Sequence, residues 1–260
     1  MAVAEKSPSW RGLVARARLW EPAAIGRLLS VIDNQPECWP LLQEQLQEGA
    51  PVAASRLACR VVGITGPPGA GKSTLLEKLL ENLVERGLRV AVLAVDPSSP
   101  FSGGAVLGDR TRIGAVAYHP RVFIRSVASR EATGGLAHSS AAMLGLLRQL
   151  GFDVVMVESV GAGQSEVSIA ALTDWRVVLC PPGLGDDVQA LKAGILEIAD
   201  VLVISKGDLP GSETTEREMR SAVSLRRSGR MPAVLRVSAA TGLGIAELVG
   251  AMLAESGKIA

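Results

Sequence analysis

The sequence lacks both an excess of charge and a long apolar run, and these two absences exclude several classes of partner. Lysine and arginine number 27 against 26 aspartate and glutamate residues, a formal net charge of +1 at pH 7. So even a balance gives no electrostatic basis for binding duplex nucleic acid or an anionic membrane surface. The apolar runs are short and are broken by glycine, proline or charge, far below the roughly 20 residues that a membrane span needs. We therefore expect a soluble protein with no nucleic-acid partner and no membrane attachment.

Cysteine and histidine are also scarce. The three cysteines, Cys38, Cys59 and Cys180, are widely separated and form no CxxC pair. This sparse, odd number favours a reducing, cytoplasmic location. The two histidines, His119 and His138, are isolated and offer no metal-ligand spacing, so we expect no tight zinc or nickel site.

The first part of the chain, residues 1–50, is predicted to be an N-terminal helical segment. Its opening, MAVAEKSPSWRGLVARARLW, is either the first helix of a folded domain or an arginine-rich transit peptide, which would place the protein in the mitochondrial matrix. Between residues 10 and 48, apolar residues at helical spacing predict two helices, broken near Asn34-Gln35-Pro36. We expect their apolar faces to pack on the main domain rather than to form a groove for a partner.

In residues 51–260, short β-branched runs alternate with helical stretches. The runs are RVVGIT, RVAVLAVD, RVFIRSVA, DVVMVESV, WRVVLC, VLVIS and AVLRVSA. The helical stretches are residues 72–86, 132–150, 186–199, 213–228 and 243–255. This alternation predicts an α/β fold with a mostly parallel, doubly wound sheet covered by helices on both faces. Ligands of such sheets bind at the carboxyl ends of the strands, so the residues that follow each run are the candidates for a site.

A glycine-rich loop that matches the GxxxxGK[ST] pattern follows the first run. Its residues are Gly66, Pro67, Pro68, Gly69, Ala70, Gly71, Lys72, Ser73 and Thr74. A strand precedes it and an amphipathic helix follows, which is the context of a phosphate-binding P-loop. Backbone N–H groups of such a loop surround phosphate oxygens. We predict that Lys72 reaches the β- and γ-phosphates and that the Ser73 hydroxyl ligates Mg²⁺.

Acidic residues follow the second run. Asp96 ends the run, and Asp109 lies in the next glycine-rich loop together with Arg110 and Arg112. A carboxylate at a strand end beside a phosphate loop suits a Mg²⁺ ligand or a water-ordering group. Alternatively, Asp96 only caps the turn before Pro97. The two arginines either neutralise phosphate charge or face water.

The fourth run also ends in a carboxylate, Glu158, although a charge at the end of an apolar strand is costly unless it is compensated. Glu158-Ser159-Val160-Gly161 has the spacing of the Asp-x-x-Gly motif of P-loop switch proteins. We predict that Glu158 faces the water shell of the cation and that Gly161 senses the γ-phosphate. The alternative is a buried salt bridge between Glu158 and an arginine. Gln164 does not directly follow the glycine, as the water-orienting glutamine of many small GTPases does, and its role stays open.

The sixth run ends in Ser205–Asp208, with the sequence SKGD, which is close to the guanine-binding NKxD motif. Asp208 would accept hydrogen bonds from the N1–H and exocyclic amine of guanine, a pair that adenine does not offer. Lys206 would lie along the base. The next run supplies Ser238 and Ala239, where a backbone N–H can meet the guanine O6. Serine in place of asparagine removes an amide that ties the base loop to the phosphate loop, so we expect looser binding with the guanine preference kept.

Taken together, GPPGAGKST, DPSSPFSGGAVLGDRTRI, VESVGAGQSE, GDDVQALKAGILEIAD, SKGD and SAATGLGIAEL resemble the MeaB/MMAA family, formerly called ArgK or LAO/AO transport kinases. The resemblance extends over about residues 20–252. It implies a GTP-binding and GTP-hydrolysing chaperone that gates cofactor loading and protects an adenosylcobalamin-dependent acyl-CoA mutase, usually methylmalonyl-CoA mutase. It also implies that Asp96, Asp109 and Glu158 form an acidic set linked to Mg²⁺. Lys72, Asp109, Glu158 and Gly161 would then carry the catalysis.

The segment GLGDDVQALKAGILEIAD, residues 183–200, contains Asp186, Asp187 and Lys192. The two aspartates either cap a helix or belong, with Lys192, to a movable switch. The resemblance implies that Lys192 belongs to a switch that couples client binding to hydrolysis. Arg112 and Gln164 complete the set of candidate switch residues.

The sequence departs from the family at three points. SKGD replaces NKxD, GAGQSE replaces GVGQSE, and the chain ends soon after TGLGIAEL, where the family generally continues into a C-terminal dimerisation extension. We expect a monomer, a homodimer formed by another surface, or a mutase whose subunits supply the missing contacts. Two alternative functions use the same loop. One is a kinase acting on a small molecule or a protein, and the other is a nucleotide-driven metallochaperone.

Overall fold

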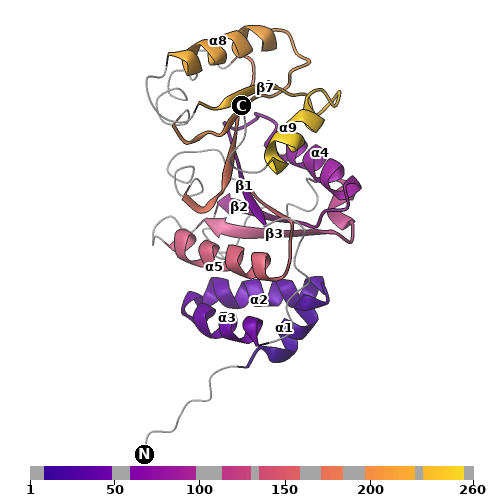
Figure 1. Cartoon of the computed structure of the whole chain (residues 1–260), viewed down its shortest axis with the longest axis vertical. Coiled ribbons are helices and arrows are strands. Elements are labelled where there is room, and N and C mark those ends of the chain that lie inside the picture. The colour runs from indigo at the N-terminus through magenta and orange to yellow at the C-terminus, as the bar shows by residue number, and fades with distance from the viewer. Residues whose placement is uncertain are drawn as a thin grey trace, which may run out of the picture.

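A computed structural model describes residues 9–48, 59–97, 113–129, 135–158, 171–183, 197–225 and 231–254. Within these ranges the core is a seven-stranded sheet with the order β3-β2-β4-β1-β5-β6-β7 (Figure 1). The strands are β1 (Arg60–Thr65), β2 (Val90–Pro97), β3 (Val122–Ser129), β4 (Val154–Glu158), β5 (Trp175–Leu179), β6 (Val201–Ile204) and β7 (Ala233–Arg236). No helix in the described ranges is long and apolar enough to cross a membrane.

All the neighbouring strands pair in parallel, so the predicted doubly wound α/β sheet is confirmed. Successive residues of each strand point into different apolar layers, as the two-residue period of a strand requires. In β4, for example, Val155 and Val157 lie in one layer, and Val154 and Met156 lie in the other. The continuous apolar runs of the sequence therefore reflect burial on both faces of the sheet.

Helices cover both faces. The helices that follow the sheet strands are α4 (Lys72–Glu85), α5 (Gly135–Gln149), α8 (Ser212–Ser224) and α9 (Ile245–Leu253), with a short helix η3 (Ala115–Tyr118). Helices α4 and α9 share an apolar layer on one face, and α5 covers the other (Figure 1). Most of the predicted helix at 186–199 lies outside the described residues. The last strand, expected over residues 233–239, ends at Arg236. The backbone N–H of Val237 still donates to Ile204 O of β6, and the chain then turns, so that the N–H of Ser238 donates to Leu243 O.

The N-terminal segment contains α1 (Arg11–Arg18), α2 (Pro22–Asn34), η1 (Pro36–Cys38) and α3 (Trp39–Gln47). Residues 10–48 form three α-helices rather than two, because residues 11–18, in the opening segment for which a first helix was one of the two alternatives, form a separate helix that ends before Trp20. Trp20 has a φ of 66°, a left-handed conformation that turns the chain between α1 and α2. The predicted break after Asn34 is confirmed.

The N-terminal helices form a layer outside α5 (Figure 1). Leu28 and Leu29 of α2 belong to the same buried cluster as Leu146 and Leu147 of α5. The Trp20 ring lies 4.5 Å from the ring of Phe152 and 4.1 Å from the guanidinium carbon of Arg89, both in the sheet domain. The apolar faces of these helices therefore pack on the main domain, as expected. The domain boundary at residues 50 and 51 stays a prediction.

Candidate nucleotide site

The glycine-rich loop connects the end of β1 to the start of α4. Gly66, Gly69 and Gly71 have φ values of 149°, 75° and 89°, which residues with a side chain rarely adopt. A Cβ on Gly66 would lie 2.9 Å from both the Cβ and the carbonyl oxygen of Leu179. Glycine is therefore required where the loop passes over the end of β5, and this close approach holds the loop against the sheet.

Lys72, the first residue of α4, turns back over this loop. Its Nζ donates hydrogen bonds to the carbonyl oxygens of Gly66 (2.8 Å) and Pro67 (3.0 Å). The side chain is buried. The ammonium group and the N-terminus of α4 thus place positive charge at the same loop, which is the electrostatic requirement for binding a phosphate group.

Ser73 meets the end of β4. The Ser73 hydroxyl donates to Glu158 Oε1 at 2.9 Å, and the Glu158 side chain is half-buried. The parallel register places Glu158 beside Ile64, two residues before the loop begins. Hydroxyl and carboxylate oxygens are the ligands that Mg²⁺ prefers, so the pair fits a magnesium site. The structure thus brings together two residues that the sequence assigned to the same metal.

The other predicted metal and switch residues are less fully described. Asp96 lies at the end of β2, where its backbone pairs with Ala128 of β3, but its side chain lies outside the described residues. The remaining candidates lie wholly outside them, namely Asp109, Arg110, Arg112, Gly161, Gln164, Asp186, Asp187 and Lys192. In the described part of the chain, no three or more His, Cys, Asp or Glu residues gather where they could hold a metal ion.

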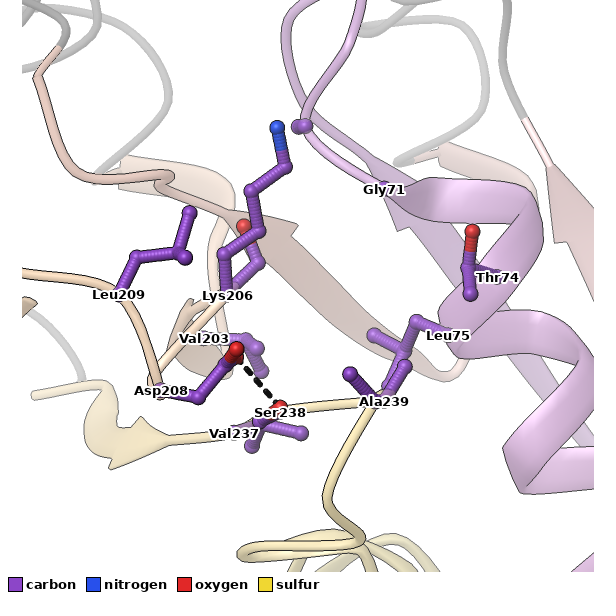
Figure 2. Close-up of a pocket in the computed structure, with 13 residues that line it drawn as sticks. Gly71, Thr74, Leu75, Val203, Lys206, Asp208, Leu209, Val237, Ser238 and Ala239 are labelled. Atoms are coloured by element: carbon purple, nitrogen blue, oxygen red, sulfur yellow. Dashed lines mark hydrogen bonds between the residues drawn. The ribbon is translucent and has the colours of Figure 1, made fainter.

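A cavity of about 200 Å³ lies between the start of α4 and the loops that follow β6 and β7 (Figure 2). It contains eight of the residues predicted from the sequence. These are Ala70, Gly71, Thr74, Ser205, Lys206, Asp208, Ser238 and Ala239. The remaining lining residues are Leu75, Val203, Leu209, Val237 and Ala240.

These five lining residues were missed in the sequence, although three of their positions carried a signal. Leu75 directly follows the GKST motif, and Val203 and Val237 are apolar residues beside the motifs that close β6 and β7. An apolar wall with a few polar groups is typical of a site for a flat organic ring. The cavity therefore suits a nucleobase.

Asp208 is held at one end of this cavity. The Ser238 hydroxyl donates to Asp208 Oδ1 at 2.6 Å, and it accepts a hydrogen bond from the backbone N–H of Thr241 at 3.2 Å (Figure 2). Asp208 itself is exposed, so its carboxylate remains accessible to a ligand. Ser238 therefore fixes the carboxylate from the protein side.

The loops that follow β6 and β7 are also joined through their backbones. The N–H of Gly207 donates to Val237 O at 2.9 Å. A Cβ on Gly207 would lie 2.7 Å from Arg236 Cγ and 3.1 Å from Val237 O, so a side chain here would force Arg236 to move. Lys206 has a φ of 53°, and its side chain extends across the cavity toward the P-loop near Gly71 (Figure 2).

The thiols of two cysteines, Cys59 and Cys180, stay protonated and are therefore unreactive. Burial raises the pKa of the Cys180 thiol to about 12. Burial likewise raises the pKa of the Cys59 thiol to about 12. Neither thiol ionises near neutral pH, so neither offers a thiolate as a nucleophile or a soft-metal ligand.

Known proteins resemble this chain over most of its length. The family described as methylmalonyl-CoA mutase-associated GTPase MeaB matches residues 27–258. The GTPase ArgK of Escherichia coli is 38% identical over 247 residues, which cover 92% of this chain and 74% of the relative. The mitochondrial methylmalonic aciduria type A homolog of Mus musculus is 40% identical over 193 residues, 72% of this chain and 46% of the relative.

A solved structure, described as an LAO/AO transport system kinase, superposes with a TM-score of 0.71 at 30% identity. The superposition covers 97% of this chain and 76% of that one. The family resemblance predicted from the motifs is thereby confirmed. The chain belongs to the methylmalonyl-CoA mutase-associated GTPase (MeaB) family and is a P-loop GTPase that binds guanine nucleotides.

Proposed function

We propose that this GTPase is a chaperone of an adenosylcobalamin-dependent acyl-CoA mutase, methylmalonyl-CoA mutase or a close relative. It gates cofactor loading and protects the mutase from inactivation. The family description and the name of the mouse relative support this client. The structural observation that supports a nucleotide-driven switch in this role is the Ser73–Glu158 hydrogen bond, because it links the phosphate loop to the strand that leads into the predicted switch.

The glycine-rich loop and the start of α4 form what we call the phosphate end of the site, where Lys72 and Ser73 bind the phosphates and the cation. On nucleotide binding, Lys72 exchanges its two carbonyl partners for β- and γ-phosphate oxygens, where its charge stabilises the transition state. Ser73 and Glu158, with Asp96 and Asp109 from the neighbouring segments, would hold Mg²⁺. Magnesium, when bound, neutralises charge on the phosphates.

The cavity lined by the loops that follow β6 and β7 is what we call the base end of the site, where Asp208 binds the base. Its carboxylate accepts from the N1–H and exocyclic amine of guanine, while Ser238 keeps it in position. The backbone N–H of Ala239 meets the O6, and the Lys206 stem covers one face of the ring. Adenine lacks this pattern of donors, so the arrangement selects guanine over adenine.

We further propose that the protein works in the cytoplasm, with the mutase as its protein partner. The predicted switch residues Arg112, Gln164, Asp186, Asp187 and Lys192 couple client binding to hydrolysis. A homodimer and a monomer both remain compatible with this role.

The client proposal predicts that a cobalamin-dependent mutase stimulates GTP hydrolysis. Without a client, we expect turnover at about 10⁻³ s⁻¹, as in GTPases that lack an arginine finger. Adding the mutase should raise the release of free phosphate roughly tenfold or more. Phosphate release is measured with GTP and with ATP, with and without the mutase. Equal hydrolysis of ATP and GTP with no stimulation by any cobalamin mutase would contradict the proposal, and phosphate on an acceptor would indicate a kinase instead.

Replacing the loop lysine tests the phosphate end. Lys72→Ala removes charge-assisted bonds worth about 1.5–3 kcal/mol each, so nucleotide affinity should fall by roughly a hundredfold and turnover should be lost. The matched control is Lys78→Ala on the same helix, because Lys78 pairs with Glu81 at the surface. Calorimetric titration with GDP measures the affinity. Turnover that survives in Lys72→Ala would refute this assignment.

Replacing the base-side carboxylate tests specificity. Asp208→Asn turns a double acceptor into a group that also donates, so GTP binding should weaken by about a hundredfold, the loss of two charge-assisted bonds. Xanthosine triphosphate, which carries a carbonyl where guanine carries the amine, should lose far less. Competition titrations with both nucleotides give the ratio. An equal loss for both bases would mean that Asp208 does not contact the base edge.

A further inference from the structure

Arg236, the last residue of β7, lies behind the base end of the site rather than inside it. It is not one of the described residues that line the cavity, and its side chain is 32% exposed. Its aliphatic stem nevertheless covers Gly207, the residue before Asp208. A Cβ on Gly207 would lie only 2.7 Å from Arg236 Cγ, so the stem leaves no room there even for a methyl group.

The guanidinium group of Arg236 is held by the first turns of α8. Its Nη1 donates to Glu213 Oε1 at 2.8 Å, and its Nε lies 3.7 Å from Glu216 Oε2. The hydrogen bond from Arg236 holds the pKa of the Glu213 carboxyl below its usual value, as expected for a carboxylate in an ion pair. The Arg236 side chain is thus fixed at its far end, which defines the position of its stem over Gly207.

The backbone of Gly207 is held from two other sides. Its N–H donates to Val237 O at 2.9 Å, and its carbonyl oxygen accepts from the Ser212 hydroxyl at 3.0 Å. Ser212 is the first residue of α8 and is only 3% exposed. With the Arg236 stem, β7 and α8 therefore hold Gly207 through three contacts, so the next residue, Asp208, leaves the backbone from a fixed position.

This position matters because the strength of a hydrogen bond falls steeply with misalignment. In the proposed site, one carboxylate of Asp208 meets two donors of guanine, the N1–H and the exocyclic amine. Ser238 holds only one of the carboxylate oxygens, Oδ1 (Figure 2). The direction of the other oxygen therefore depends on where the backbone of Asp208 lies.

We propose that Arg236 is a positioning residue for guanine recognition, which keeps Gly207, and through it the Asp208 carboxylate, aligned with the two guanine donors. The inference rests on the proposed contact between Asp208 and guanine and deepens it. Exposed ion pairs add little to the stability of a protein. Loss of the arginine should therefore change the preference for the base more than the melting temperature.

The experiment compares GDP with inosine diphosphate (IDP), whose base lacks the exocyclic amine of guanine. Calorimetric titrations give the dissociation constants of both nucleotides for the wild-type chain, for Arg236→Ala and for a control, Arg217→Ala. The wild type should prefer GDP by roughly tenfold or more, the contribution of one charge-assisted bond. Arg236→Ala should lower this preference by roughly threefold or more, with a melting temperature within about 4 °C of the wild type. The control should keep the wild-type preference, because Arg217 is an exposed residue of α8 that bonds only to Glu213 O and the Thr214 hydroxyl of its own helix.

A second set of variants tests whether Arg236 acts through Gly207. Gly207→Ala places a methyl group against Arg236 Cγ, so it should lower the preference for GDP when the arginine is present. In Arg236→Ala the obstructing stem is absent, so the same substitution should reduce the preference by a factor roughly threefold smaller. Equal effects of Gly207→Ala in the two backgrounds would show that the residues act independently and would overturn the inference.

Two further results would overturn the inference while leaving the proposed function intact. One is an Arg236→Ala variant that keeps the wild-type preference for GDP over IDP. The other is a variant that loses affinity for both nucleotides equally, because a fold that is merely loosened does not distinguish the two bases. A wild-type chain that binds GDP and IDP equally would instead refute the proposed contact between Asp208 and the exocyclic amine, and the Arg236 inference with it.

Discussion

The hydrogen bond between Ser73 and Glu158 is the contact on which the phosphate end of the site depends. The two residues are 85 positions apart in the chain, and their distance of 2.9 Å follows from the pairing of β1 with β4. The P-loop leaves β1 and returns at the start of α4, which places Ser73 over the carboxyl end of β4. The buried parallel register therefore fixes where the carboxylate lies, and in the proposed site a bound cation would compensate a charge that is otherwise costly at this place.

The base end depends on a second set of constraints. Gly207 is held against Val237 by a backbone hydrogen bond, and Ser238 holds Asp208, so the loops after β6 and β7 act as one unit. Gly66 is packed against Leu179 of β5, the strand between β1 and β6. The phosphate end and the base end are thus joined through consecutive strands of the same sheet. A nucleotide that spans both ends meets a preformed surface, which lowers the entropic cost of binding.

Much of the fold could be predicted from the sequence, because continuous apolar runs and the P-loop spacing are local signals. The turn at Trp20 could not, since it depends on the contacts of that ring with Arg89 and Phe152, which are distant in the chain. The residues that meet in the base cavity were predicted from motifs, but the apolar wall around them depends on how the start of α4 faces β6 and the loops that follow β6 and β7. Nor does a motif reveal that the Ser205 hydroxyl lacks a protein partner, because that follows from the packing around it.

The most direct test of the central claim is the magnesium dependence of nucleotide binding in Glu158→Gln. We expect GTP binding without Mg²⁺ to stay within about twofold of the wild type, because a neutral amide can still accept from Ser73. The Mg²⁺ concentration needed for half-maximal enhancement should rise roughly tenfold or more, since a charge-assisted contact to the cation is lost. An unchanged magnesium requirement, or an equal loss of binding with and without Mg²⁺, would contradict the claim that Glu158 serves the cation.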